Sequence, residues 1–338
     1  MKKFWLRCAT VVAVVAGLVG CERAPELVHL TGETMGTYYS IKYIATDATP
    51  SQDVVQAAID QRLETVNDQM STYRTDSELS QFNQHQANSP VSVSPATITV
   101  INEAIRLNQF TQGALDVTVG PLVNLWSFGP EKRPETIPSD EEIASRMAMT
   151  GLEHLSVDGR RLIKTNPDLY VDLSTIAKGY GVDVVANYLG DLGLDNYLVE
   201  IGGELQLKGM NQDQVPWRIA IEKPSAGAQS VQEIVEPGDM AVATSGDYRN
   251  YFESDGMRYS HIIDPATGRP INHHLVSVTV LDPSCMTADG LATGFMVLGP
   301  DKAMELANKA NIPVFMVVKT DDGFEEIASE AFKPYLQR

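Results

Sequence analysis

The spacing of apolar residues predicts two amphipathic helices in the first third of the chain. In residues 51–70 and again in residues 95–111, apolar side chains recur every three or four positions. This period puts them on one face of a helix, and that face is expected to be buried. The predicted faces are Val54, Val55, Ala58, Ile59, Leu63 and Val66 in the first helix, and Ile98, Ile101, Ile105 and Leu107 in the second.

A third pattern changes from strand to helix. Residues 169–173 are short and apolar, which is typical of a strand, and Ser174 then suits the N-cap of a helix that continues to Leu192. The predicted helix contains Gly179 and Gly181, each of which costs about 1 kcal/mol relative to alanine. We therefore expect a close approach at these glycines.

Shorter patterns predict the remaining elements. The pair Gly202-Gly203 indicates a tight turn between two strands. Strands cluster with strands and helices with helices, which favours an α+β fold with mixed or antiparallel sheets and flanking helices. Strands are expected at 154–157, 162–164, 170–173, 197–201, 204–208, 217–221, 240–244, 259–263, 275–281 and 313–318, with further helices at 140–149, 287–298 and 300–310.

The N-terminal residues have the pattern of a lipoprotein signal. Basic residues precede the apolar stretch 9–18, which is shorter than the roughly 20 residues that span a bilayer. Leu18-Val19-Gly20-Cys21 resembles a bacterial lipobox, in which Cys21 is lipidated and begins the mature protein; the alternative is a plain signal peptide with an incidental cysteine. The expected division is a signal peptide (1–20), a lipidated tether (21–30) and one domain (31–338).

A lipid anchor implies a body tethered to a membrane outside the cytoplasm. We expect the periplasmic side of the cell inner membrane, although these residues do not distinguish one membrane from another. Of the three cysteines, Cys8 leaves with the signal and Cys21 is acylated, so Cys285 has no partner for an intrachain disulfide.

The charge of the chain restricts its ligands. The sequence has 26 Lys and Arg against 44 Asp and Glu, a net charge of −18, which becomes −21 when the three basic residues of the signal are lost. Such an acidic surface argues against nucleic acid and against a broad footprint on anionic membranes. An anionic cofactor would need local neutralisation, most simply by a divalent metal ion.

Three segments carry candidate chemistry, each with a plainer alternative. The predicted helix start between Asp172 and Lys178 suits an anion such as a pyrophosphate, or is an ordinary strand-to-helix turn. Asp289 and Thr293 share a helical face and could both reach one Mg²⁺, or could serve the helix dipole and packing. His261, at the end of a predicted strand, could act as a general base, or could be a structural histidine.

The segment Ala243 to Tyr248 is small and polar after a predicted strand, so it could line a ligand cleft or form a hairpin turn. The sequence contains neither GxxxxGK[ST] nor GxSxG, which excludes a Walker nucleotide triphosphatase and the usual nucleophile elbow of an α/β-hydrolase.

Taken together, these segments resemble the ApbE family of flavin transferases. The resemblance spans nearly all of the mature chain, and its specificity lies in the order of the motifs. They are Met35-Gly36-Thr37, Met70-Ser71-Thr72-Tyr73 with Ser77-Glu78-Leu79, Ala114-Leu115-Asp116 continuing to Gly120-Pro121, Asp172 to Asp183, Gly202-Gly203-Glu204, Ala243 to Tyr248, His261 to Pro270, and Ala288 to Thr293.

The resemblance implies two lobes around an FAD cleft. The residues that it implies to contact FAD are Met35, Tyr73, Ala114, Leu115, Asp116, Asp172, Lys178 and Ile263. It also implies that Mg²⁺ is held by the side chains of Asp289 and Thr293 and by the backbone oxygen of Thr175.

The implied reaction transfers FMN from FAD to a Thr or Ser hydroxyl of an acceptor protein, forming a phosphoester and releasing AMP. His261 is our candidate for the base and Asp289 for the catalytic metal ligand. The implied acceptors are flavinylated membrane redox subunits, such as those of sodium-pumping NADH:quinone reductase complexes. Two alternatives stay open: an FAD pyrophosphatase that releases free FMN, and a periplasmic flavin-binding lipoprotein without turnover.

Overall fold

The computed structural model describes residues 26–85, 88–129, 137–222, 231–246, 251–254 and 257–336. Within these residues, a main sheet of eight strands has the order β1-β2-β6-β7-β10-β15-β16-β17. Every neighbouring pair is antiparallel. The strands are β1 (Glu26–Thr34), β2 (Thr37–Ala45), β6 (Tyr197–Ile201), β7 (Glu204–Lys208), β10 (Ala241–Gly246), β15 (Leu275–Asp282), β16 (Val314–Thr320) and β17 (Gly323–Ala328).

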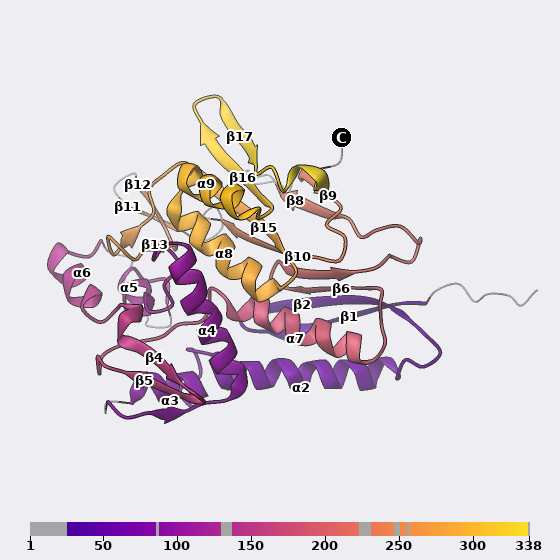
Figure 1. Cartoon of the computed structure of the whole chain (residues 1–338), viewed down its shortest axis with the longest axis horizontal. Coiled ribbons are helices and arrows are strands. Elements are labelled where there is room, and N and C mark those ends of the chain that lie inside the picture. The colour runs from indigo at the N-terminus through magenta and orange to yellow at the C-terminus, as the bar shows by residue number, and fades with distance from the viewer. Residues whose placement is uncertain are drawn as a thin grey trace, which may run out of the picture.

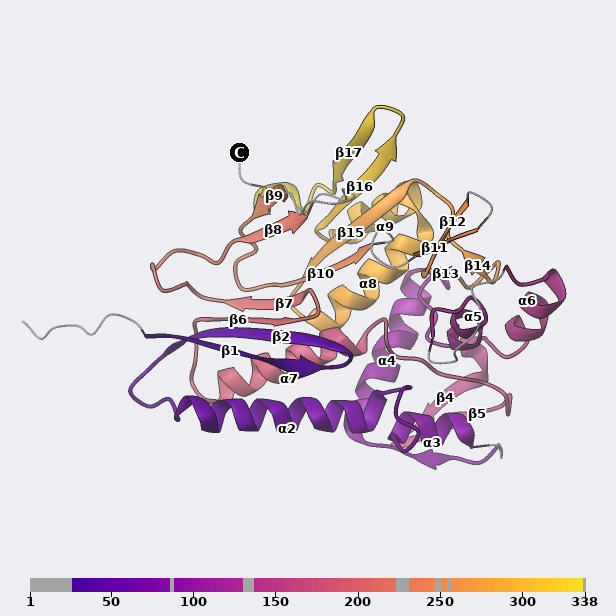
Figure 2. The ribbon, with the colours of Figure 1, turned by 180° about the vertical axis from the view of Figure 1, so that it is seen from behind.

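Helices cover one face of this sheet. Figure 1 shows the helices in front of the strands, and Figure 2 shows the strands from the other side. The long helices are α2 (Gln52–Met70), α4 (Pro95–Phe110), α7 (Ala177–Asp191), α8 (Cys285–Leu298) and α9 (Pro300–Ala310). Their apolar sides and the facing strand residues form the largest core. Among the described helices, none is both long and apolar enough to cross a membrane.

Strand alternation supplies a second core on the opposite face. Along β16, Val314 and Met316 point into the large core, whereas Phe315 and Val317 point into the smaller one. The smaller core is closed by β8 (Ile219–Glu222), β9 (Val231–Val235) and the C-terminal turn η2 (Lys333–Tyr335). Because both faces of the sheet are covered, β15 is buried along its whole length except for its last residue, Asp282.

A group of short elements lies at the other end of the molecule (Figure 1). It contains a three-stranded sheet in the order β3-β5-β4 and two separate hairpins, β11-β12 and β13-β14. The elements are α3 (Glu78–Gln84), β3 (Val91–Ser92), α5 (Gly120–Leu125), α6 (Asp140–Met147), η1 (Leu152–His154), β4 (Leu155–Asp158), β5 (Arg161–Lys164), β11 (Tyr251–Ser254), β12 (Met257–Ser260), β13 (Ile263–Asp264) and β14 (Arg269–Pro270).

The α+β class is confirmed, as are the two helices predicted first. The structure has them at Gln52–Met70 and Pro95–Phe110. Val54, predicted on the buried face, is instead 55% exposed. The Gly202-Gly203 turn joins β6 to β7, with φ of 62° and 105°, values that glycine adopts without strain.

Other boundaries were wrong. Residues 169–173 form no strand, because the Asn83 side chain takes both the N–H and the C=O of Val171, at 2.8 Å each. Residues 26–30, which the sequence placed in the tether, form the first half of β1, with Leu30 buried. The predicted strand 259–263 is interrupted between β12 and β13. Cys21 and the signal peptide lie outside the described residues.

Gly179 and Gly181, the two glycines near the start of α7, do mark close approaches. A Cβ at Gly179 would lie 2.3 Å from the backbone oxygen of Cys285 and 2.8 Å from Cβ of Asp289, both on α8. A Cβ at Gly181 would lie 2.7 Å from Cε of Met35. The absence of a side chain at Gly179 therefore lets α7 and α8 pack closely where both helices supply site residues.

We expect Gly179→Ala to destabilise the protein by about 1–3 kcal/mol, the usual cost of overpacking a close contact. Chemical denaturation of both variants measures the effect against Gly190→Ala as the control. Gly190 lies on the same helix, where an added Cβ meets nothing within 4 Å. Alanine there should be neutral or stabilising by up to about 1 kcal/mol. Equal effects of the two substitutions would contradict the packing argument.

Candidate active site

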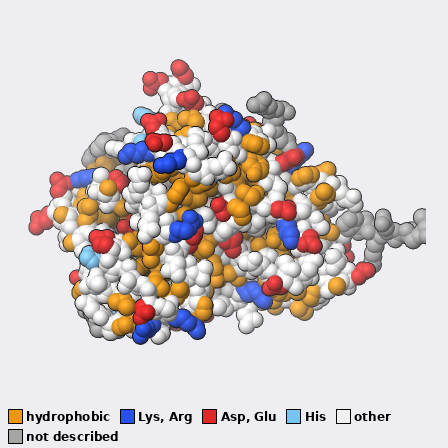
Figure 3. Space-filling model, viewed as in Figure 1, with side chains coloured by type: hydrophobic (Ala, Val, Ile, Leu, Met, Phe, Trp, Pro, Cys, Tyr) orange, Lys and Arg blue, Asp and Glu red, His pale blue; other side chains and the backbone are white. Residues whose placement is uncertain are grey.

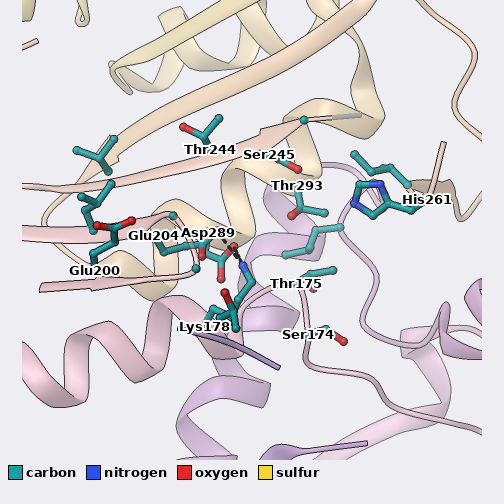
Figure 4. A pocket seen from close by; sticks show the side chains of 18 of the residues that line it. Ser174, Thr175, Lys178, Glu200, Glu204, Thr244, Ser245, His261, Asp289 and Thr293 are labelled. Carbon is teal, nitrogen blue, oxygen red and sulfur yellow. Dashed lines mark ion pairs between the residues drawn. The ribbon is translucent and has the colours of Figure 1, made fainter. Parts of the chain in front are cut away.

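A cavity of about 800 Å³ lies where the main sheet, α7, α8 and the short elements meet. This volume lies in the upper part of the range of about 300–1,000 Å³ that is usual for small-molecule and cofactor sites. Almost every site residue expected from the sequence lines it: Tyr73, Ala114, Leu115, Asp116, Asp172, Thr175, Lys178, His261, Ile263, Asp289 and Thr293. Figure 4 shows the part around Asp289.

Three charged side chains from three elements converge in the cavity (Figure 4). The ammonium Nζ of Lys178 lies 2.8 Å from Oε1 of Glu204 and 3.8 Å from Oδ1 of Asp289. The other Asp289 oxygen, Oδ2, accepts the backbone N–H of Gly179 at 2.9 Å. Both carboxylates are buried, while Lys178 keeps 31% of its side chain exposed. The cluster thus carries one more negative charge than positive when fully ionised.

Burial controls the protonation of this cluster. It raises the pKa of Asp289 to about 7, although the Lys178 ammonium acts in the opposite direction. Burial by itself would lower the pKa of Lys178, but the carboxylates of Asp289 and Glu204 outweigh it and raise that pKa. A buried carboxylate that ionises only near neutral pH lacks sufficient positive charge around it, and a bound cation would supply that charge.

The turn before α7 is organised by Asp172. Its Oδ1 accepts the backbone N–H of Ser174 at 2.9 Å and also the Ser174 hydroxyl. Ser174 is therefore occupied within the turn, and the predicted N-cap role is wrong: α7 begins at Ala177 after Ile176. Thr175 lies between Ser174 and Ile176, and its buried hydroxyl Oγ1 has no hydrogen-bond partner in the described part of the chain.

Another acidic residue, Asp116, lines the cavity among short elements. Its carboxylate accepts the backbone N–H of Thr118 at 2.7 Å and the Thr118 hydroxyl at 2.6 Å. Burial raises the pKa of Asp116 above its ordinary value. The nearby Tyr73 side chain is 70% exposed, so it lies at the mouth of the cavity, where an aromatic face is available to a planar ring.

His261 lies across the cavity from Lys178 and Glu204, closer to Thr293 and Ser245 (Figure 4). It occupies the break between β12 and β13, where the Ser260 hydroxyl accepts the N–H of Ile262 at 3.2 Å. The ring of Phe128 packs against it edge-on at 6.2 Å between centroids. His261 thus lies between the two strands, and its side chain is part of the cavity wall.

Met35 is the predicted FAD contact that does not lie among the residues lining the cavity, and the sequence analysis did not single out Glu204. Met35 does not line the cavity; it has a positive φ of 50° in the β1–β2 turn and its side chain packs against Gly181. Glu204 appeared only as the end of a glycine-rich motif. The available signal was a charged residue that directly follows the glycine turn and begins a strand in which Leu205 and Leu207 alternate with polar residues.

The donor set fits a hard divalent cation. Asp289 offers a carboxylate oxygen and Thr293 a hydroxyl one turn later. The Thr175 hydroxyl and Oε2 of Glu204 are buried and have no hydrogen-bond partner among the residues that the structure describes. Oxygen ligands of this kind suit Mg²⁺, which keeps open positions for substrate phosphates. Among the described residues, no three His, Cys, Asp or Glu side chains form a cluster that could hold a metal ion without substrate oxygens as additional ligands. The site therefore fits an ion held jointly by protein and an anionic substrate.

The fold and the cavity together define an α+β protein with one large cleft whose lining includes the buried carboxylates of Asp289 and Glu204. Residues 35–316 match the model of the ApbE family. The chain belongs to this family, as its motifs predicted.

Characterised relatives are similar over nearly their whole length. The chain is 66% identical to an FAD:protein FMN transferase of Vibrio cholerae serotype O1 over 321 residues, covering 95% of this chain and 96% of the relative. It is 44% identical to the FAD:protein FMN transferase of Escherichia coli K12 over 342 residues, covering 97% of each. Its structure matches the flavin transferase ApbE from Vibrio cholerae with a TM-score of 0.88 and 65% identity, over 92% of this chain and 100% of that one.

Proposed function

We propose that this protein is a Mg²⁺-dependent FAD:protein FMN transferase. The observation that carries the proposal is the convergence of Asp289, Thr293 and the Thr175 turn on one cavity, together with the family to which the chain belongs. The hydroxyl of an acceptor Thr or Ser attacks the FMN-side phosphorus of FAD. A new phosphoester bond forms, the bond between the two phosphates breaks, and AMP leaves.

Different residues of the cavity have different roles in this reaction. Tyr73 and the segment Ala114 to Asp116 contact FAD at the mouth and floor, and Lys178 supplies positive charge beside its diphosphate. Asp289 and Thr293, with Thr175, hold Mg²⁺, which when bound neutralises charge on the diphosphate. His261 removes the proton of the acceptor hydroxyl as attack proceeds.

We further propose that the protein acts on the periplasmic side of the inner membrane, anchored through a lipid on Cys21. Only residues 22–25 separate Cys21 from β1, so an extended tether reaches at most about 18 Å. A body held so close to the bilayer suits acceptors that are themselves membrane redox subunits, such as those of NADH:quinone reductase-type pumps.

Nucleic acid is not proposed as a partner. On the face shown in Figure 3, the Lys and Arg side chains lie scattered among acidic ones, unlike the clustered basic surface of a nucleic-acid-binding protein.

One assay tests the proposal against its two alternatives. The protein is incubated with FAD, Mg²⁺ and an acceptor peptide containing a single Thr, and the products are separated by mass. We expect a peptide heavier by FMN, together with AMP, and no product when EDTA is in excess. Free FMN without modified peptide would indicate a pyrophosphatase, and unchanged FAD would indicate a binding protein. Either result would refute the transferase assignment.

A further inference from the structure

Lys178 lies between two buried carboxylates but not midway. Its Nζ is 2.8 Å from Oε1 of Glu204, a direct ion pair, and 3.8 Å from Oδ1 of Asp289, which is the outer limit of one. In Figure 4 the three side chains point toward one another from separate elements. The ammonium is therefore bound by Glu204 and only approaches the expected metal ligand.

The backbone determines which of these groups can move. Asp289 is fixed, because its Oδ2 accepts the Gly179 N–H at 2.9 Å and its Cβ is in close contact with α7. Glu204 is the first residue of β7, directly after the tight turn, and is only 5% exposed. Lys178 has a flexible four-carbon side chain that is 31% exposed. Of the three groups, the ammonium is the one that could change partner.

We propose that Glu204 is a positioning residue that holds the Lys178 ammonium away from Asp289 and so keeps an Asp289 oxygen open to a divalent cation. Without Glu204, the nearest carboxylate for the ammonium is Asp289, and a buried charge without a partner is strongly disfavoured. Lys178 would then close onto Oδ1, and a cation would have to displace it. This inference rests on the proposed function, since it assigns Asp289 to the metal.

The test measures Mg²⁺ binding directly, without turnover. Isothermal titration of the full-length protein in detergent, saturated with FAD and without acceptor peptide, gives the dissociation constant for Mg²⁺. We expect Glu204→Gln to weaken binding about tenfold, within the range of coupling between contacting groups. Glu204→Asp keeps the charge but shortens the side chain, so it should also weaken binding.

Glu200→Gln is the matched control. Glu200 lies on the same hairpin, lines the same cavity and loses the same charge, but no ion pair joins it to Lys178 among the described residues. It should change Mg²⁺ binding by no more than about twofold, as expected of a weakly coupled charge. Thermal melting of each variant separates loss of the site from loss of the fold.

A double-mutant cycle with Lys178→Met gives the decisive comparison. If Lys178 closes onto Asp289 when Glu204 is lost, removing Lys178 should improve binding at least about fivefold more in the Glu204→Gln background than in the unmodified protein. Equal gains in both backgrounds would mean that Glu204 acts only through its charge. Weakened binding that Lys178→Met does not recover would mean that Glu204 contacts the cation itself. Either result overturns the inference, whereas absence of Mg²⁺ binding in the unmodified protein would overturn the proposed metal dependence as well.

Discussion

Replacing Asp289 with alanine is expected to lower FMN transfer by about 10³-fold and to abolish its response to Mg²⁺. Loss of a group that stabilises charge in a transition state commonly costs about 10²–10³-fold, and here the same carboxylate also retains the ion. Thr293 and the Thr175 turn carry no charge to replace it, and the charge of Glu204 is paired with Lys178. Transfer rates measured over a Mg²⁺ series, with EDTA as the end point, would show both effects.

The control for this variant is Asp195→Asn. Asp195 is an exposed carboxylate that pairs with Lys208 at 2.7 Å, outside the cavity lining. It loses the same charge and should transfer FMN at the normal rate. Asp289→Ala also leaves the Gly179 N–H without its acceptor, a loss of about 1–3 kcal/mol in the free energy of unfolding. The assay is therefore run well below the melting temperature of the variant. Full activity of Asp289→Ala in excess EDTA would rule out the site.

The parts of the fold that the sequence predicted well are those with local causes. The α2 helix follows from its own apolar period, and the β6–β7 hairpin follows from two glycines that adopt positive φ. The segment 169–173 has the composition of a strand, but it forms none, because the side chain of Asn83, distant in the sequence, binds the backbone of Val171. A side chain that takes both backbone groups of Val171 leaves no pattern in the segment that it binds.

In the site, too, the features with local causes could be predicted from the sequence and the long-range contacts could not. Asp289 and Thr293 could be paired from their spacing within one helix, and the structure has them in one cavity. The contact between Lys178 and Glu204 joins a helix to a hairpin, and no spacing in the sequence encodes that approach. Met35 was assigned by resemblance, and its packing against Gly181 depends on where the β1–β2 turn lies relative to α7. Long-range pairs of this kind become visible only once the sheet and the helices are assembled.

Replacing His261 with alanine is expected to preserve FAD binding and to cut the rate of transfer by about 10²–10⁴-fold, the usual contribution of a general base. The reason is position: His261 lies on the cavity wall across from Lys178, toward Thr293, and not in the ion-pair cluster around Asp289. FAD affinity should therefore depend little on it, whereas deprotonation of the acceptor hydroxyl should depend on it strongly.

Single-turnover transfer, with enzyme in excess over acceptor peptide, isolates this step from product release. The control is His154→Ala, because His154 is a partly exposed histidine outside the cavity lining whose Nδ1 is hydrogen-bonded to the Thr165 hydroxyl at 3.0 Å. An unchanged single-turnover rate in His261→Ala would exclude His261 as the base. Loss of FAD binding in that variant would instead make it a binding residue. Slow transfer with normal FAD affinity is the combination expected of a group that acts on the acceptor hydroxyl.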